Sequence, residues 1–220
     1  MKSKNKIITT TSLLATLLLS HPAAVWAQEK PEAKEAAPSA AKDAAQPLAQ
    51  LAGKDAAKPA AIFQKPGLLT SVGQSSDIVV VKTLLNTRLK MGLDVKTMAQ
   101  PEDLAGIKTL LVVLGASTKG MGAAGLNLDK EMDRARALVK TAKDKGIDIL
   151  ALHVGGESRR GKTTSDLSEI VIPSAKYVVV LESGNKDKDF TNIAAKGSAG
   201  ITEAAKLADV GDAIKALFKE

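Results

Sequence analysis

Three apolar runs in this chain each end in a loop that is rich in glycine, small polar residues and charge. The runs cover residues 68–69, 110–114 and 149–154, and the loops cover residues 70–77, 115–122 and 155–163. Each loop leads into a stretch with helical spacing. In a parallel α/β sheet the carboxyl ends of all strands lie along one edge, where ligands bind. The pattern therefore predicts a parallel sheet and a candidate site formed by three loops that are distant in sequence.

Strand-like and helix-like patterns alternate from Pro66 onward. The clearest helical spacing lies in residues 128–145, where Met132, Ala135 and Leu138 share one side. Such alternation predicts right-handed βαβ units. We expect an α/β fold with a three-layer parallel sheet of about five strands and helices on both faces, flavodoxin-like or Rossmann-like, in the order 2-1-3-4-5. The expected strands lie near residues 67–71, 93–98, 109–114, 148–154 and 177–181.

Residues 1–27 have the three parts of a signal peptide in order. Lysines begin the segment, an apolar region follows, and Val25-Trp26-Ala27 forms a small-x-small cleavage site. This predicts a periplasmic or extracellular protein, cleaved near Ala27-Gln28. The alternative is an uncleaved N-terminal anchor, which would also place the domain outside the cytoplasm.

Residues 28–65 form an alanine-, lysine- and proline-rich segment, in which alanine supplies 13 of 38 positions. So little apolar surface does not offset the entropy of ordering, and a disordered linker is predicted. It is interpreted either as a spacer from a membrane or wall, or as a neutral leader. Residues 66–220 are expected to form a single α/β domain.

The charge and composition argue against several classes of partner. Of the formal charge of +7, residues 1–27 carry +3 and residues 28–65 carry +1, which leaves +3 on the domain. Nucleic-acid binders usually show a broad basic face, often with stacking aromatic residues, and this sequence indicates neither. The chain has no cysteine, so it offers no lipidation site and no thiolate chemistry. No cofactor and no metal are expected.

Residues 156–163 match the P-loop pattern G-x-x-x-x-G-K-[ST] and lie between a strand and a helix. Three interpretations remain open. The segment binds a nucleotide, it is a glycine-rich turn with solvated basic residues, or it presents Arg159 and Arg160 to a phosphate or carboxylate. Guanidinium forks suit such planar oxygen pairs, which favours the third interpretation. The short helix before Pro173 and the predicted export both weigh against the first.

The other loops supply candidates for the same ligand. We expect Lys119 and the two arginines to supply charge, Gln74, Ser75 and Ser117 to supply hydrogen bonds, and Glu157 and Asp166 to orient the arginines. The glycines of residues 115–125 allow close backbone approach. Residues 185–189 place oxygen ligands at alternate positions, but the calcium-loop pattern fails beyond them. The full predicted set is Gln74, Ser75, Ser76, Ser117, Thr118, Lys119, His153, Glu157, Arg159, Arg160, Ser165 and Asp166.

His153 is the only histidine outside the predicted signal peptide and ends a central strand. It suggests a second function, a hydrolase that uses the same loops with His153 as base. No spacing in the sequence forms a recognisable triad, so binding is favoured over catalysis. The P-loop nucleotide binder is the third and least favoured function.

The loops at 70–77, 115–125, 153–161 and 182–187, with Ser165-Asp166 and Phe190-Thr191, resemble those of a family of exported bacterial proteins. Each member is built around a single Rossmann-like domain of unknown function. The resemblance implies export and a Rossmann-like fold, and it supplies no established activity. It makes the P-loop match incidental, because Lys162 and Thr163 lie outside the similar stretches. The expected partner is a small anionic molecule and not a nucleic acid, and a transporter or envelope partner is left open.

Overall fold

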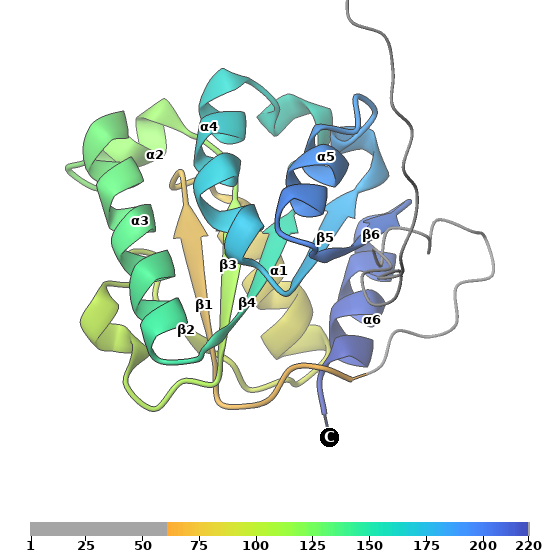
Figure 1. The fold of residues 1–220 in the computed structure, drawn as a ribbon. Helices are drawn as coiled ribbons and strands as arrows, with labels where there is room; N and C mark the ends of the chain where they lie inside the picture. The colour runs from red at the N-terminus through yellow and green to blue at the C-terminus, as the bar shows by residue number, and fades with distance from the viewer. Residues whose placement is uncertain (1–60, 220) are drawn as a thin grey trace, which may run out of the picture. The chain divides into compact units, whose positions relative to one another are not determined.

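The central strands of the sheet are buried and largely apolar, because helices cover them on both faces. The computed structural model describes residues 61–219, and these residues form a six-stranded, entirely parallel sheet (Figure 1). The strands are β1 (Gly67–Val72), β2 (Asp94–Val95), β3 (Thr109–Leu114), β4 (Asp148–His153), β5 (Tyr177–Leu181) and β6 (Gly200–Ala204). Their order across the sheet is β2-β1-β3-β4-β5-β6.

Helices cover both faces of this sheet. They are α1 (Asp77–Lys82) with its π-helical continuation η1 (Thr83–Arg88), α2 (Thr118–Ala123), α3 (Leu128–Asp144), α4 (Lys162–Val171), α5 (Asp189–Lys196) and α6 (Leu207–Leu217). Four short 3-10 turns complete the fold: η2 (Pro101–Leu104), η3 (Gly156–Arg159), η4 (Ile172–Ser174) and η5 (Glu182–Gly184). In Figure 1, α3, α4 and α5 lie in front of the sheet, and α1 and α6 lie behind it.

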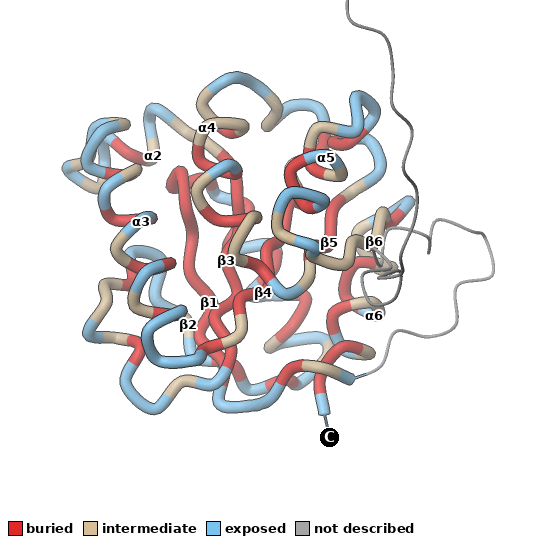
Figure 2. Tube along the Cα trace, viewed as in Figure 1, coloured by how far each residue is buried: buried red, intermediate tan, exposed pale blue. Residues whose placement is uncertain are grey.

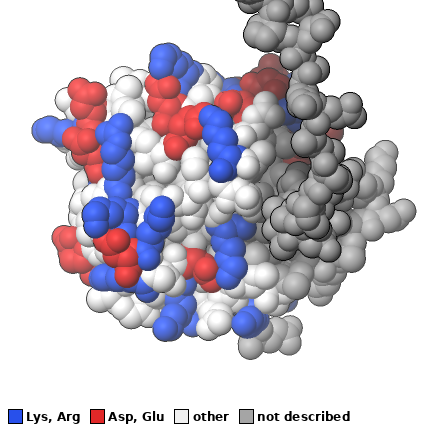
Figure 3. Space-filling view, viewed as in Figure 1, with Lys and Arg blue, Asp and Glu red and all other residues white. Residues whose placement is uncertain are grey.

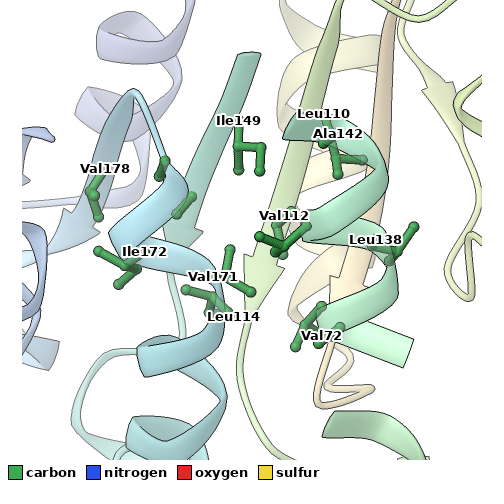
Figure 4. Close-up of a cluster of buried hydrophobic side chains, with 14 of the residues drawn as sticks. Val72, Leu110, Val112, Leu114, Leu138, Ala142, Ile149, Val171, Ile172 and Val178 are labelled. Atoms are coloured by element: carbon green, nitrogen blue, oxygen red, sulfur yellow. The ribbon is translucent and has the colours of Figure 1, made fainter. Parts of the chain in front are cut away.

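Strand β3 shows how the sequence produces two cores. Leu110, Val112 and Leu114 pack into the cluster beneath α3 and α4, drawn in Figure 4. The alternate residues Leu111 and Val113 pack into the cluster beneath α1 and α6. Successive side chains of a strand point to opposite faces, so a strand covered on both faces is expected to be apolar at nearly every position. All six residues of β3 are accordingly buried, as the red centre of Figure 2 shows.

The predicted fold class is confirmed, and the predicted strand order is recovered with one strand added. The sequence prediction missed β6, whose residues are mostly half-buried and do not form an apolar run. The second predicted strand is shorter than expected, since only Asp94 and Val95 pair with β1. Helix α3 agrees closely with its prediction: Asn127 caps it by accepting from Lys130 N at 2.9 Å, and it ends before Gly146.

The first described residues already belong to the fold, upstream of the boundary expected at Pro66. Ile62 N and Phe63 N both donate to Leu217 O, and the Phe63 ring is fully buried 5.7 Å from the ring of Phe218. Residues 1–60, with the predicted signal peptide and most of the predicted linker, lie outside the described residues. Within residues 61–219, no helix is both long and apolar enough to cross a membrane.

Candidate functional site

The loops that follow β1, β3, β4 and β5 meet at one edge of the sheet. The chain leaves β1 toward β2 on one side and leaves β3 toward β4 on the other, so the connections diverge between β1 and β3. In sheets of this kind, ligands bind where the connections diverge. Ser117 N donates to Gly73 O at 2.8 Å, and Gln74 bridges to Ala116, which ties the first two loops together.

A buried ion pair on α3 fixes the loop after β1. Glu131 and Arg134 are 0% and 6% exposed, and Arg134 Nε donates to Glu131 Oε2 at 2.8 Å. Glu131 Oε1 accepts from Gly73 N at 2.7 Å and from Gln74 Nε2 at 3.0 Å. Arg134 also donates to the backbone oxygen of Ser71. Gln74, predicted as a ligand contact, therefore uses its amide inside the protein, where it holds the loop in place.

Asp77 and Arg159 meet across the edge although 82 positions separate them. Asp77 is 9% exposed, and its Oδ2 is buried without a hydrogen-bond partner. Arg159 Nε lies 3.6 Å from Asp77 Oδ1, and Arg159 Nη2 donates to Ser76 Oγ at 3.3 Å. Both distances are long for charge-assisted contacts, so this guanidinium is loosely held. The residues expected at the site did not include Asp77, so the sequence did not predict this pair.

Bare backbone lies on two sides of the Asp77 carboxylate. A Cβ atom added to Gly115 would stand 3.0 Å from Asp77 Oδ2, and one added to Gly155 would stand 2.6 Å from it. The same atom on Gly155 would collide with Arg159 Cγ, because the Arg159 chain lies directly on this glycine. Any larger residue at 115 or 155 would fill the space that Asp77 and Arg159 occupy.

Arg160 is held far more firmly than Arg159. Its Nη2 donates to Asp187 Oδ2 at 2.8 Å and to Asp189 Oδ2 at 2.9 Å, and its guanidinium lies 4.6 Å from the centre of the Phe190 ring. Ser165 Oγ donates to Asp189 Oδ2 at 2.7 Å. The two aspartates after β5 therefore both bind one nitrogen of a largely buried cation, the Arg160 guanidinium.

The acidic partners expected for the arginines are different in the structure. Glu157 pairs with Lys186 at 2.9 Å, and Asp166 pairs with Lys162 at 2.7 Å, so neither orients Arg159 or Arg160. Lys162 is the lysine of the P-loop match, and its side chain is 88% exposed in this i,i+4 pair. These contacts give no support to phosphate binding by Lys162.

The loop after β3 leaves its polar side chains near the surface. Ser117 is half-buried and caps α2, since its Oγ accepts from Gly120 N at 3.0 Å. Thr118 and Lys119 are exposed beside it. Ser75, in the loop after β1, is 1% exposed, and its Oγ accepts from Asp77 N at 3.4 Å. Lys119 is the one cation among these side chains, and it is exposed.

His153 lies inside the protein. It is 0% exposed, with Nδ1 3.0 Å from Leu114 O and Nε2 3.1 Å from Gly156 O, and its ring packs 4.6 Å from that of Phe190. Burial lowers the pKa of His153 below its ordinary value, because the low-dielectric interior disfavours the imidazolium. Both ring nitrogens face carbonyl oxygens rather than a hydroxyl, so this geometry gives no support to a hydrolase base.

Neither of two surface hollows in the described residues is lined by Asp77, Lys119 or Arg159. One, of about 440 Å³, lies between α3 and α4 and includes Arg136, Lys140 and Lys143 in its lining. The other, of about 380 Å³, includes Val79, Val80 and Leu207 in its lining.

On the face drawn in Figure 3, basic and acidic side chains are interspersed rather than segregated. Among residues 61–219, no group of three or more histidine, aspartate or glutamate side chains is placed to hold a metal ion.

The all-parallel sheet, covered on both faces and with its connections diverging between β1 and β3, defines a Rossmann-like or flavodoxin-like α/β domain. More particularly, the family model of a domain of unknown function, DUF6305, matches residues 64–218, and the chain belongs to this family. The sequence-based expectation of a family without an assigned function is thereby confirmed.

Comparisons with individual proteins add little. No functionally curated protein matches the chain by sequence. Among solved structures, the X-ray crystal structure of the YdjI aldolase from Escherichia coli K12 is matched at 12% identity and a TM-score of 0.22, over 69% of this chain and 78% of that one. A likeness at this level carries no argument about fold or function.

The ion pairs of Arg160 predict a pH effect. Arg160 holds the pKa of Asp187 below its usual value, chiefly by donating a hydrogen bond to the carboxylate. A depressed pKa stabilises the folded state above the unfolded-state pKa, and the contribution is lost as pH falls through the folded-state pKa. We expect NMR titration to give Asp187 a midpoint below that of a free aspartate, and Arg160→Ala to return it to the normal range. Arg136→Ala is the control and should leave the Asp187 midpoint unchanged. An unaltered midpoint in Arg160→Ala would show that Arg160 does not lower the pKa of Asp187.

Proposed function

We propose that this domain acts outside the cytoplasm and binds a small anionic ligand, bearing a phosphate or carboxylate, at the carboxyl edge of its sheet. The proposal rests on the long distance between Arg159 and its nearest carboxylate. Its nearest carboxylate oxygen is 3.6 Å away, whereas Arg160 and Lys162 have carboxylate oxygens within 2.9 Å. Exchange of a loose contact for a close bidentate one favours ligand binding, because charge-assisted hydrogen bonds strengthen as they shorten.

The position of Arg159 supports the same conclusion. Its side chain is one-third exposed and extends from the loop after β4 toward Ser76, in the loop after β1. Lys119, exposed in the loop after β3, supplies a second cation at the same edge. A small anion between these loops would contact Arg159 and Lys119, while Arg160 stays bound to its two aspartates and fixes the loop after β4.

The main test compares two basic residues of one loop. Arg159→Ala should weaken binding of inorganic phosphate or a short carboxylate about 10–100-fold, the equivalent of one charge-assisted hydrogen bond of about 1.5–3 kcal/mol. Lys162→Ala should change affinity less than about threefold, since Lys162 is paired with Asp166 and almost fully exposed. Isothermal titration calorimetry on the mature chain measures both. Loss of binding in Lys162→Ala with none in Arg159→Ala would reverse the assignment.

The proposed location has its own test. Fractionation of cells that express the full chain should recover the protein outside the inner membrane, and N-terminal sequencing should begin at Gln28. The expected cleavage follows Ala27, which has a small residue two positions before it. Full-length protein in the cytoplasmic fraction would contradict the proposed location and would make the nucleotide-binding interpretation worth testing again.

A further inference from the structure

The unpartnered carboxylate oxygen of Asp77 constrains the ligand further. A buried polar atom without a partner is costly, and native proteins satisfy more than 90% of them. Asp77 is 9% exposed, its Oδ2 has no partner, and its Oδ1 has only the long Arg159 contact of 3.6 Å. A ligand that carried only negative charge would meet this carboxylate as a repulsive neighbour.

The side chain that covers Asp77 lies on bare backbone. Arg159 rests on Gly155, and Gly115 borders Asp77 on the neighbouring strand end. If Arg159 turns outward to take an anion, the space it leaves is bounded by glycine backbone and has the Asp77 carboxylate beside it. The vacated guanidinium position then needs a hydrogen-bond donor, because Asp77 would otherwise lose its contact with Arg159.

From this geometry we infer that the ligand of the proposed site combines its anionic group with an adjacent donor, as small α-amino acids and α-hydroxy acids do. The anion binds Arg159, and the ligand's ammonium or hydroxyl replaces the guanidinium at Asp77. Arg159 and Asp77 are direct neighbours before the ligand binds. A compact ligand that carries both groups on adjacent atoms can therefore contact Asp77 and the Arg159 guanidinium that has turned outward. This inference rests on the proposed anion site and adds the class of ligand that the site selects.

Three acids of the same carbon skeleton test the inference: propionate, L-lactate and L-alanine, titrated into the mature chain by calorimetry. We expect lactate and alanine to bind at least about tenfold more tightly than propionate, since each adds one hydrogen bond to a charged group. Asp77→Asn keeps the side-chain volume and removes the charge. In this variant, most of the difference in affinity between alanine and propionate should disappear, because the charge that attracts the ammonium is gone. The difference between lactate and propionate should be reduced less. Propionate itself should bind with unchanged or slightly higher affinity.

The outcomes separate the inference from the proposed function. If all three acids bind with equal affinity and Arg159→Ala weakens them equally, the anion site stands and the selection by Asp77 is wrong. If Asp77→Asn weakens propionate as strongly as alanine, Asp77 supports the loop rather than contacting the donor. If neither these acids nor inorganic phosphate bind, both proposals fail. Thermal unfolding of Asp77→Asn, expected within about 5 °C of the parent chain, shows that the variant is folded.

Discussion

Replacing Glu131 with glutamine should lower the free energy of unfolding by about 3–5 kcal/mol, because it leaves the Arg134 charge buried and without its carboxylate. Glu131 has no exposed surface, and Arg134 is 6% exposed. Removing one member of such a pair costs more than the pair contributes, since the remaining charge has been taken out of water. A loss of this size is a large part of the stability of a typical domain.

Helix α3 provides a matched control for this substitution. Asp133 and Arg136 form another i,i+3 pair on the same helix, at 3.0 Å, with side chains 78% and 54% exposed. Asp133→Asn should cost less than about 1 kcal/mol, because solvent screens an exposed pair. Urea unfolding of both variants gives the comparison. Equal losses would show that burial of the Glu131 pair does not set its importance.

Gly73→Ala should also destabilise the protein by more than about 3 kcal/mol, for two separable reasons. Gly73 has φ of +96°, a region that residues with a Cβ rarely adopt. The added Cβ would also collide with the backbone of Gly115, standing 2.7 Å from its carbonyl carbon. Because both partners are backbone at the ends of β1 and β3, the clash cannot be relieved by a side-chain rotation.

Gly125→Ala separates the cost of the positive φ from the cost of the backbone clash. Gly125 has φ of +71°, and a Cβ there would meet nothing within 4 Å. Its alanine variant therefore measures the backbone cost alone, which is about 1–2 kcal/mol. We expect Gly73→Ala to be clearly worse by thermal or urea unfolding. If the two variants lose the same stability, the two strand ends move apart more easily than this packing implies.

The sequence carried enough information to predict the fold because β3, β4 and β5 are near-continuous apolar runs. Such runs require cover on both faces, which specifies helices on both sides of a parallel sheet. The edge strands lacked this signal. Strand β6 is half-buried and mixes threonine and glutamate with apolar residues, and β2 pairs through only two residues. Their pairing depends on the neighbouring strand more than on their own pattern.

The position of the candidate site could be predicted from the sequence, but the contacts among its side chains could be predicted only in part. Parallel strands end on one side, so loops far apart in sequence had to meet there. Which charges pair within the edge depends on side-chain directions, and these put Asp187 and Asp189 beside Arg160 where Glu157 and Asp166 were expected. The contact between Asp77 and Arg159 could not be predicted, because an aspartate at a helix start is usually an ordinary cap.

One signal for the missed network was present in the sequence. Glu131 precedes Ala135 by four positions and Leu138 by seven, so it lies in line with the apolar side of α3. A charged residue at such a position is buried and needs a partner, and Arg134 stands one turn away. A charged residue within an apolar stripe is therefore a sequence signal for a buried ion pair.

The most direct test of the proposed anion site is to map phosphate binding by amide chemical-shift changes in NMR spectra of residues 28–220. The domain offers two basic places to compare: the edge with Arg159 and Lys119, and the hollow between α3 and α4 lined by Arg136, Lys140 and Lys143. We predict saturable shifts at residues 73–77, 115–120 and 155–160, and little change along α3. Shifts confined to Arg136, Lys140 and Lys143, with the edge loops unaffected, would contradict the proposed site.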